Sequence, residues 1–557
     1  MKFNVKKNIL FSITIFFLFG TLSIALYSNP ELQKKEIDKY LSGIYKADMP
    51  GAAVLAVKNG KVILRKGYGM ADMELNVPMR TEMVFRIGSI TKQFTSVGIM
   101  MLVEEGKVKL EDLITVYLPE YPLKGKKVTV RHLLNHTSGI KSYTSMPEFG
   151  KIMRTDIEVE KLIDVFKEQP FDFEPGEKYL YNNSGYILLG AIIEKVSGLK
   201  YADFIKTRIF DKAGMNSSIY GEAAAIIKNR AKGYGRNDKG VVNSSYLSMT
   251  LPYAAGSLLS TVDDLYKWNR SLSTGKLISK KSLKKVYKRT SLNNGEEISY
   301  AFGFMNIDFH GYTQIHHGGG INGFITHEVY IPEEEIFVTV LTNSTGNKIS
   351  PQFVSQWITT LLLGKSYSED AGRILTEKEL NEYVGIYEIS KDDERSVTRE
   401  GNKLFTQRTG SIKQEAFNKS IDKFFFKKSF TWFTFERDKR DGKVIAMTMH
   451  SLSGKDFAKK IAKKVKIKKA VDIDKSIYKE LAGRYQMQGF LIDVSINSGK
   501  LMIQATGQKS AQIFPLSELR YFLKVVDAEI EFIKDPDGKV TGLILYQGKV
   551  KLEGKRL

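Results

Sequence analysis

The 557-residue chain contains no cysteine. This absence excludes disulfide bonds, thiolate metal sites, a cysteine nucleophile and a lipid-modified N-terminal cysteine. Hydrophobic residues make up 42% of the sequence and charged residues 26%, which are ordinary proportions for a globular protein. Because a single hydrophobic core stops growing at about 250–300 residues, the length predicts more than one domain.

Charge is missing from a long stretch near the N-terminus. Three lysines lie among the first seven residues, and no further charge follows until Glu31. This order is typical of a secretory leader, so we predict that residues 1–28 form a signal peptide or an N-terminal membrane anchor. Ser-x-Ala at 23–25 offers a cleavage site, whereas the apolar run 9–27 is nearly the ~20 residues that a bilayer span needs, and both fates stay open. We expect an exported protein, periplasmic, extracellular or tethered to the outer side of the cytoplasmic membrane.

Aromatic residues are absent from the most basic part of the chain. The formal net charge is +22, and the run KKIAKKVKIKK (Lys459–Lys469) holds seven lysines. Stacking on nucleic-acid bases would require aromatics between the lysines, so we expect no nucleic-acid partner. Contact of this run with an anionic cell-envelope surface stays open. The alternation over 465–468 favours an ordinary strand with one solvated face.

Recognisable metal-binding patterns are also lacking. The chain has seven histidines, four of them within 310–327, but their spacing fits neither H-E-x-x-H nor the Cys/His zinc patterns. We therefore expect no metal and no cofactor. His316 is interpreted as a strand residue. His132 and His136, in and around LLNHTSG, are interpreted as residues that fix a loop through hydrogen bonds.

Mixed helices and short strands extend over residues 29–370, which we expect to form one α+β domain. Asn59-Gly60 between two apolar runs predicts a β-hairpin. From Ser89 the pattern becomes helical, and Gly106 is placed to end that helix.

The remaining sequence repeats itself. YVGIY (383–387) recurs as LAGRY (481–485). Phe435 lies 97 residues before Phe532, and the same distance separates Gly410 from Gly507. Short alternating strands with Gly and Asp turns fill each copy, which suits a small antiparallel barrel or sandwich. We therefore divide this region into 371–470 and 471–557, while a single continuous β domain stays open as the alternative.

Three separated motifs carry the candidate chemistry. Ser89-Ile-Thr-Lys92 places a hydroxyl and an amine on one face of a helix. A helix N-terminus stabilises negative charge, and a desolvated lysine is more easily neutral, so it could accept the serine proton. Tyr181-Asn182-Asn183 follows a Pro-Gly turn, and His317-Gly318-Gly319 precedes a flexible glycine turn.

Ser-x-x-Lys, then Tyr-x-Asn, then a basic residue-x-Gly, in that order, resembles the penicillin-recognising serine hydrolases. The middle motif looks most like that of class C β-lactamases, related esterases and D-amino-acid peptidases. The resemblance covers roughly residues 31–365. It implies a β-lactamase/transpeptidase-like α+β catalytic domain, and by weaker analogy it implies that the two repeats are lipocalin-like antiparallel barrels, as in D-aminopeptidase-type members.

The resemblance also implies roles for individual residues. Ser89 would attack a carbonyl carbon and form an acyl-enzyme, with Lys92 and Tyr181 sharing the general-base work. Which of the two takes the proton stays open. Asn183 would hold Lys92 and a substrate amide. The remaining implied substrate and oxyanion residues are His317, Gly319 and Gly320, with the oxyanion hole formed by the backbone N–H groups of Ser89 and Gly320.

His317 departs from the family pattern, because lactam-binding members usually have a lysine there. A histidine with a pKa near ~6.5 is mostly neutral at pH 7 and pairs less strongly with a substrate carboxylate. We therefore expect a serine hydrolase of peptidase (D-amino-acid) or esterase type rather than an efficient β-lactamase. Two alternatives stay open, a penicillin-binding receptor that acylates without turnover and a wall- or lipid-binding protein acting through its β repeats. The oligomeric state stays undetermined.

Overall fold

The computed structural model describes residues 29–557 except 147, 392, 452–453, 466–467, 488–489, 507 and 549. The predicted leader, 1–28, lies outside the described residues. None of the helices in the described part of the chain is both long and apolar enough to span a bilayer. The chain forms two compact units. The first contains Arg154–Gly235, Asn243–Ser368 and the chain up to Thr144, and the second contains Ser145–Met153, Arg236–Val242 and Glu369–Leu557.

A six-stranded antiparallel sheet is the centre of the first unit. In order across the sheet, the strands are β12 (Met305–Phe309), β13 (Tyr312–Ile321), β14 (Phe324–Ile331), β15 (Ile336–Thr342), β1 (Ala52–Lys58) and β2 (Lys61–Tyr68). β15 is buried along its whole length because it is central and covered on both faces. The predicted hairpin is confirmed: β1 and β2 are joined by Asn59 and Gly60, which both have positive φ angles (50° and 73°), as a tight hairpin turn requires.

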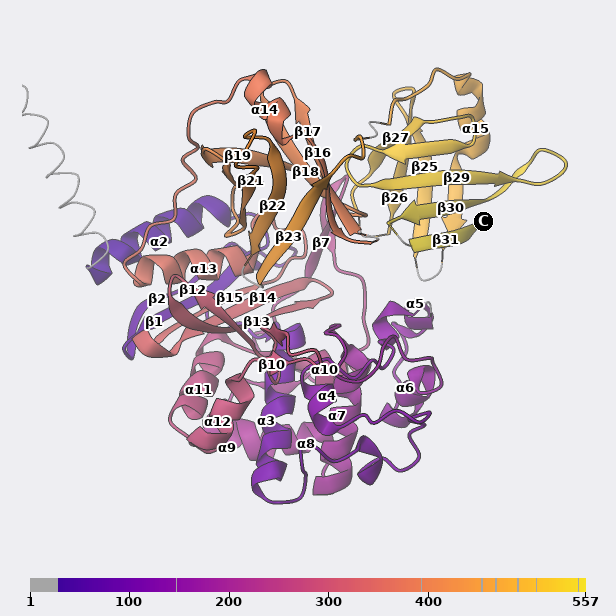
Figure 1. Ribbon diagram of the computed structural model, residues 1–557. Helices are drawn as coiled ribbons and strands as arrows, with labels where there is room; N and C mark the ends of the chain where they lie inside the picture. The colour runs from indigo at the N-terminus through magenta and orange to yellow at the C-terminus, as the bar shows by residue number, and fades with distance from the viewer. Residues whose placement is uncertain are drawn as a thin grey trace, which may run out of the picture. The chain divides into compact units, whose positions relative to one another are not determined.

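Helices cover both faces of this sheet (Figure 1). α2 (Pro30–Ile44) and α13 (Pro351–Leu362) lie on one face, and a larger helical group lies on the other. The helices of that group are α3 (Thr91–Glu104), α4 (Val130–Leu134), α6 (Val159–Phe166), α7 (Asn183–Ser197), α8 (Tyr201–Ile205), α10 (Tyr253–Gly256), α11 (Val262–Ser273) and α12 (Lys280–Tyr287). A small sheet of β5 (Phe85–Arg86), β9 (Leu258–Ser260) and β6 (Ile219–Tyr220) leads into α3.

α3 runs through the middle of the helical group. Every residue from Thr91 to Leu102 is buried, so the helix is surrounded on all sides. Phe94 stacks on Trp268 with ring centroids 4.1 Å apart, and the indole Nε1 donates to Gln93 Oε1 at 2.9 Å. The helix ends at Glu104, and Gly106 adopts a left-handed conformation (φ 71°), which confirms the predicted stop.

The second unit contains two closed eight-stranded antiparallel barrels, which confirms the expected α+β domain followed by two β-barrels (Figure 1). The first barrel consists of β16 (Gly385–Ser390), β17 (Asp393–Glu400), β18 (Lys403–Arg408), β19 (Gln414–Ser420), β20 (Lys423–Phe425), β21 (Trp432–Arg437), β22 (Val444–Ser451) and β23 (Gly454–Ile461). The second consists of β24 (Gly483–Gln486), β25 (Leu491–Asn497), β26 (Lys500–Ala505), β27 (Ala511–Pro515), β28 (Arg520–Leu523), β29 (Ala528–Lys534), β30 (Val540–Gln547) and β31 (Val550–Arg556).

The two barrels repeat the same details. A short helix precedes each first strand, α14 (Glu377–Tyr383) in one and α15 (Tyr478–Leu481) in the other. In both, a buried tyrosine hydroxyl donates to a backbone carbonyl four residues earlier, from Tyr387 to Tyr383 and from Tyr485 to Leu481, at 2.7 Å each. The motif repeat in the sequence is therefore a repeat of this helix-to-strand contact.

The sequence predicted a strand over 465–468, but the first and last of these residues are not in a strand. Val465 and Lys468 lie in irregular chain between β23 and β24, and 466–467 lie outside the described residues. Both barrels close through their first and last strands, so the connecting chain has no free strand edge with which to pair. Lys468 instead forms ion pairs with Asp527 (3.2 Å) and Glu529 (2.8 Å).

Candidate active site

Ser89 lies in a single turn of 3₁₀ helix, Gly88–Ile90, between β5 and α3. It is partly exposed, although the residues on both sides of it are buried. Gly88 has a positive φ angle (53°), and a Cβ atom there would lie 2.9 Å from the backbone nitrogen of Gly320. The glycine at 88 therefore lets the serine turn approach β13 closely enough for backbone to meet backbone.

Lys92 is the second residue of α3, and its side chain is fully buried. Its Nζ is 3.2 Å from Ser89 Oγ, 2.9 Å from Asn183 Oδ1 and 2.8 Å from the carbonyl oxygen of Ala255. Burial, which disfavours the charged form, lowers the pKa of Lys92 well below its usual value. A neutral amine has two hydrogens and one lone pair. If Asn183 and Ala255 accept the hydrogens, the lone pair is left for the Ser89 hydroxyl.

Tyr181 stands beside this pair, just before α7. Lys92 Nζ lies 4.8 Å from the centre of its ring. Its hydroxyl is buried and has no hydrogen-bond partner within the described part of the chain. Burial raises the pKa of Tyr181. The nearby Ser89 hydroxyl offsets part of that rise, although it is not positioned to form a hydrogen bond with Tyr181. The environment thus favours the protonated form of Tyr181, whereas at Lys92 it favours the deprotonated amine.

The N-terminus of α7 fixes the third motif residue. Asn182 caps the helix, its Oδ1 accepting from the backbone N–H of Gly185 at 2.9 Å. Asn183 follows as the first helical residue. Its Nδ2 donates to Thr144 Oγ1 at 3.0 Å, which turns its Oδ1 toward Lys92. The side-chain amide of Asn183 is therefore held through both its nitrogen and its oxygen.

His317 lies on β13 and is buried. Its Nδ1 is 2.6 Å from the carbonyl oxygen of Gly318, so Nδ1 carries the hydrogen and donates, and Nε2 is then free to accept from the Tyr300 hydroxyl at 3.1 Å. Burial, the largest cause, lowers the pKa of His317 to about 3. The imidazole is neutral at physiological pH, and both of its nitrogens are engaged within the protein.

The glycines after His317 pack against the turn that carries Ser89. A Cβ atom on Gly319 would lie 1.9 Å from the carbonyl oxygen of Ile87 and 2.4 Å from Thr326 Oγ1. Thr326 Oγ1 in turn donates to that same carbonyl at 3.0 Å. A Cβ atom on Gly320 would meet only Ile325 Cδ1, at 3.6 Å. The structure thus brings the predicted Ser89, Lys92, Tyr181, Asn183 and His317 together and places Gly319 and Gly320 beside Ser89.

Sequence reasoning missed the aromatic surroundings of the site. Tyr300 contacts His317, and the imidazole of His136 lies between Tyr300 and Tyr181, with ring centroids 4.5 and 4.3 Å away. Tyr186 adds a further ring, 5.4 Å from Lys92 Nζ. LLNHTSG marked the His136 segment, but no spacing connects Tyr300 to the three motifs, since tertiary packing alone brings it there.

The other histidines have structural partners. The loop-fixing role is confirmed for His132 and His136, whose Nδ1 atoms accept the backbone N–H groups of Thr129 and Asn182, each at 3.2 Å. His316 is a strand residue, as expected. It lies 3.1 Å from His327, which contacts Ser355 Oγ at 2.6 Å. Across the described residues, no group of three or more His, Asp or Glu side chains could hold a metal ion.

Comparison with known sequences and structures agrees with this geometry. The profile of the beta-lactamase family matches residues 35–352, more than half of the chain. A profile described as a domain of unknown function, DUF3471, matches residues 370–461 and again 467–556. The chain is 30% identical to penicillin-binding protein 4* of Bacillus subtilis (strain 168) over 397 residues, which cover 67% of this chain and 87% of that protein.

Two solved structures extend the comparison. The octameric penicillin-binding protein homologue from Pyrococcus abyssi is 27% identical, with a TM-score of 0.55 over 77% of this chain and 98% of that chain. The D-amino acid amidase from Ochrobactrum anthropi SV3 is 25% identical, with a TM-score of 0.51 over 60% of this chain and 97% of that one. With its α+β domain and its serine and lysine at hydrogen-bond distance, the chain belongs to the beta-lactamase family and is a serine hydrolase with the β-lactamase/transpeptidase-like fold.

Proposed function

We propose that the protein is an exported hydrolase that cleaves amide or ester bonds through an acyl-enzyme on Ser89, and that it prefers substrates without a free carboxylate. The observation that carries the proposal is the 3.2 Å contact between Ser89 Oγ and the buried amine of Lys92, whose pKa burial lowers. The charged-then-apolar leader supports export.

Lys92 is the better of the two candidate bases. Burial lowers the pKa of Lys92 and raises that of Tyr181, so the amine gives up its proton more readily than an ordinary lysine, whereas the phenol keeps its own. Ser89 Oγ bonds to the carbonyl carbon as its proton passes to Lys92 Nζ. Collapse of the tetrahedral intermediate then breaks the bond to the leaving group, which receives a proton from the Lys92 and Tyr181 pair. Water hydrolyses the resulting ester and restores the serine.

The oxyanion is assigned to two backbone N–H groups, those of Ser89 and Gly320. The close packing of Gly88 against Gly320 supports this pairing, because it keeps the two backbones next to each other. Such preorganised donors typically contribute about 10²–10³ in rate for each group. Asn183, already held by Thr144 and Lys92, is positioned to meet a substrate amide.

The substrate preference follows from His317. A neutral imidazole with both nitrogens engaged offers no positive charge to a substrate carboxylate. β-Lactams and peptides ending in D-Ala-D-Ala carry such a carboxylate, whereas simple esters and D-aminoacyl amides do not. The similarity to a D-amino acid amidase supports D-aminoacyl amides as the first compounds to test.

The test combines trapping and turnover. Intact-mass measurement after a fluorophosphonate should show one adduct per chain, absent in Ser89→Ala and retained in Ser197→Ala, a control at the far end of α7. A panel of p-nitrophenyl esters, D-aminoacyl p-nitroanilides and nitrocefin should then give a higher kcat/KM for the first two classes. A stable adduct without turnover would instead identify a receptor, and a much higher kcat/KM for nitrocefin would overturn the preference.

Export has its own test. Expression of the chain with a C-terminal tag, followed by fractionation, should place it outside the cytoplasm. Removal of the first 28 residues should retain it inside. Equal cytoplasmic retention of both forms would contradict export.

A further inference from the structure

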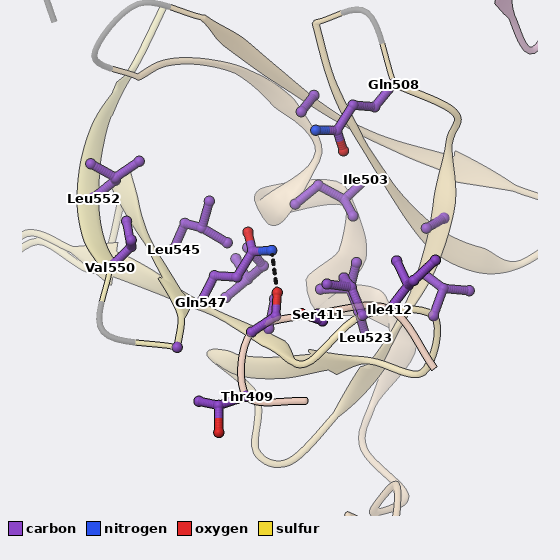
Figure 2. Close-up of a pocket in the computed structure, with 18 of the residues that line it drawn as sticks. Thr409, Ser411, Ile412, Ile503, Gln508, Leu523, Leu545, Gln547, Val550 and Leu552 are labelled. Atoms are coloured by element: carbon purple, nitrogen blue, oxygen red, sulfur yellow. Dashed lines mark hydrogen bonds between the residues drawn. The ribbon is translucent and has the colours of Figure 1, made fainter. Parts of the chain in front are cut away.

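The second barrel holds a large apolar cavity that the catalytic chemistry does not use. Its volume is about 1260 Å³, and it extends from the barrel interior to the chain segment 409–412 of the first barrel. Figure 2 shows Ile503, Leu523, Leu545 and Leu552, from four different strands, directed toward the same open space. Sites for small molecules are typically clefts of ~300–1,000 Å³ with mostly hydrophobic walls and a few polar groups. The cavity has both the capacity and the lining of such a site.

The first barrel carries charged side chains at the matching position. Paired strands place Arg395 opposite Arg408 in the first barrel and, 97 residues later, Ile492 opposite Ala505 in the second. Arg408 forms an ion pair with Asp393, through its Nε at 2.8 Å, and a longer contact of 3.8 Å with Asp456. The chain therefore contains two copies of one barrel, one with charged side chains at this end and one without.

The apolar counterparts in the second barrel leave the space open. Asp456 corresponds to Leu552, because Asp456 pairs with Met449 and Leu552 with Leu545 in equivalent registers. Asp393 corresponds to Phe490, 97 residues later. Aromatic bulk is also lost, since Phe433 and Phe426 correspond to Ile530 and Leu523. Several inward side chains of the second barrel stay only partly buried in consequence: Phe490, Ala505, Leu523, Leu545 and Leu552.

Polar groups gather only at the mouth of the cavity. Gln547 Nε2 donates to the carbonyl oxygen of Gly410 at 2.9 Å, which fixes the first barrel's segment at the rim (Figure 2). Arg408 is already neutralised by Asp393. Lys509 also lines the cavity and is exposed. The mouth therefore offers a lysine above an apolar interior, while the carboxylate of Asp238 accepts from the backbone N–H of the neighbouring Ser510 at 2.8 Å.

From this arrangement we infer that the second barrel binds a single-chain amphiphile of the fatty-acid type, with its hydrocarbon chain in the barrel and its carboxylate at the mouth near Lys509. Burial of the chain removes apolar surface from water on both sides, which is the dominant favourable contribution to such binding. The carboxylate stays partly solvated, so the lysine contributes to selectivity more than to affinity.

The first test measures binding to the full-length chain carrying Ser89→Ala, so that hydrolysis cannot interfere. Titration with 11-(dansylamino)undecanoic acid should show one saturable site, and palmitate should displace the probe. The double variant Ala505→Arg, Leu552→Asp introduces the counterparts of Arg408 and Asp456 into the second barrel and should weaken binding by at least tenfold. Leu523→Phe, a smaller change that restores the aromatic of the first barrel, should weaken it in the same direction if the double variant fails to fold.

Control variants test whether the probe occupies the cavity of the second barrel. Met502→Arg changes the outer face of β26, one residue from the inward Ile503, and should leave affinity unchanged. Lys509→Glu should weaken palmitate binding several-fold and leave 1-hexadecanol unaffected. Absence of saturable binding, or equal affinity in the cavity variants and in Met502→Arg, would overturn the inference. If Lys509→Glu weakened displacement by hexadecanol and by palmitate to the same extent, the assignment of the head group would be overturned.

Discussion

At the scale of single residues, the site depends on an amine that has no counter-ion among the residues the structure describes. The three groups that contact Lys92 Nζ are a hydroxyl, an amide oxygen and a backbone carbonyl, and none of them carries a charge. A carboxylate in that position would favour the ammonium and raise the pKa. Desolvation instead acts alone, which lowers the pKa and favours the neutral amine that can act as a base.

Lys92→Met tests this base directly, because methionine preserves much of the buried volume and removes the amine. We expect kcat/KM to fall by about 10²–10⁴, the usual contribution of a positioned general base. Adduct formation with a fluorophosphonate should slow in parallel. Lys195→Met, on the exposed face of α7, serves as the matched control and should retain activity, so equal losses in the two variants would refute the assignment.

The pH profile of the wild-type enzyme provides an independent measurement. Only the neutral amine accepts a proton, so kcat/KM should rise with pH as Lys92 loses its proton and reach a plateau above its pKa. Because burial lowers that pKa, the plateau should be reached well below pH ~10.5, the ordinary range for lysine. An ascending limb centred at pH 10 or above would show a normal lysine or a tyrosine acting as base.

His317→Lys tests the substrate preference. An ammonium in this position could donate a charge-assisted hydrogen bond to a carboxylate, worth about 1.5–3 kcal/mol, so the kcat/KM ratio of penicillin to a neutral ester should rise by about 10–100-fold. His317→Gln keeps the polarity without the charge and should leave the ratio near its wild-type value. An unchanged ratio in both variants would place carboxylate recognition elsewhere.

At the scale of elements, β13 and the Ser89 turn fit together because two positions lack side chains. Gly319→Ala would bring a Cβ atom within 1.9 Å of the Ile87 carbonyl oxygen, and neither backbone can move without displacing the nucleophile. We expect a loss of about 1–3 kcal/mol in unfolding free energy and a large fall in kcat, measured by thermal melts and steady-state kinetics.

The neighbouring glycine is the control for this prediction. A Cβ atom on Gly320 meets only the tip of Ile325, and Gly320→Ala keeps the backbone N–H assigned to the oxyanion hole. It should therefore be nearly wild-type in stability and in kcat. Equal damage from both substitutions would show that loss of glycine flexibility, and not the backbone contact, is responsible.

The elements also show why the sequence predicted some features and not others. The Asn59-Gly60 hairpin and the stop of α3 at Gly106 follow from local backbone preferences, which the sequence displays directly. The ring contacts among Tyr300, His136 and His317 join segments far apart in the chain and carry no local signal. Likewise, the alternation at 465–468 looked like a strand, but a strand needs a partner edge, and closed barrels provide none.

At the scale of the whole molecule, the first unit contains a complete sheet and all the predicted site residues. β15 is the last strand of that sheet along the chain, and α13 covers it before the barrels begin. A fragment of residues 29–370 should therefore fold and hydrolyse a p-nitrophenyl ester. Circular dichroism and ester turnover measure the two properties. An insoluble or inactive fragment, while the full chain is active, would show that the barrels support the catalytic fold.

Closure of the barrels has an evolutionary consequence. β16 pairs with β23 and β24 with β31, so neither copy leaves an open row of backbone donors and acceptors to recruit another strand. A duplicated segment of this kind can be added to a gene without creating an aggregation-prone intermediate, since each copy satisfies its own backbone. Once the duplicate is tolerated, its side chains are free to diverge, as Arg408 in one barrel and Ala505 in the other illustrate.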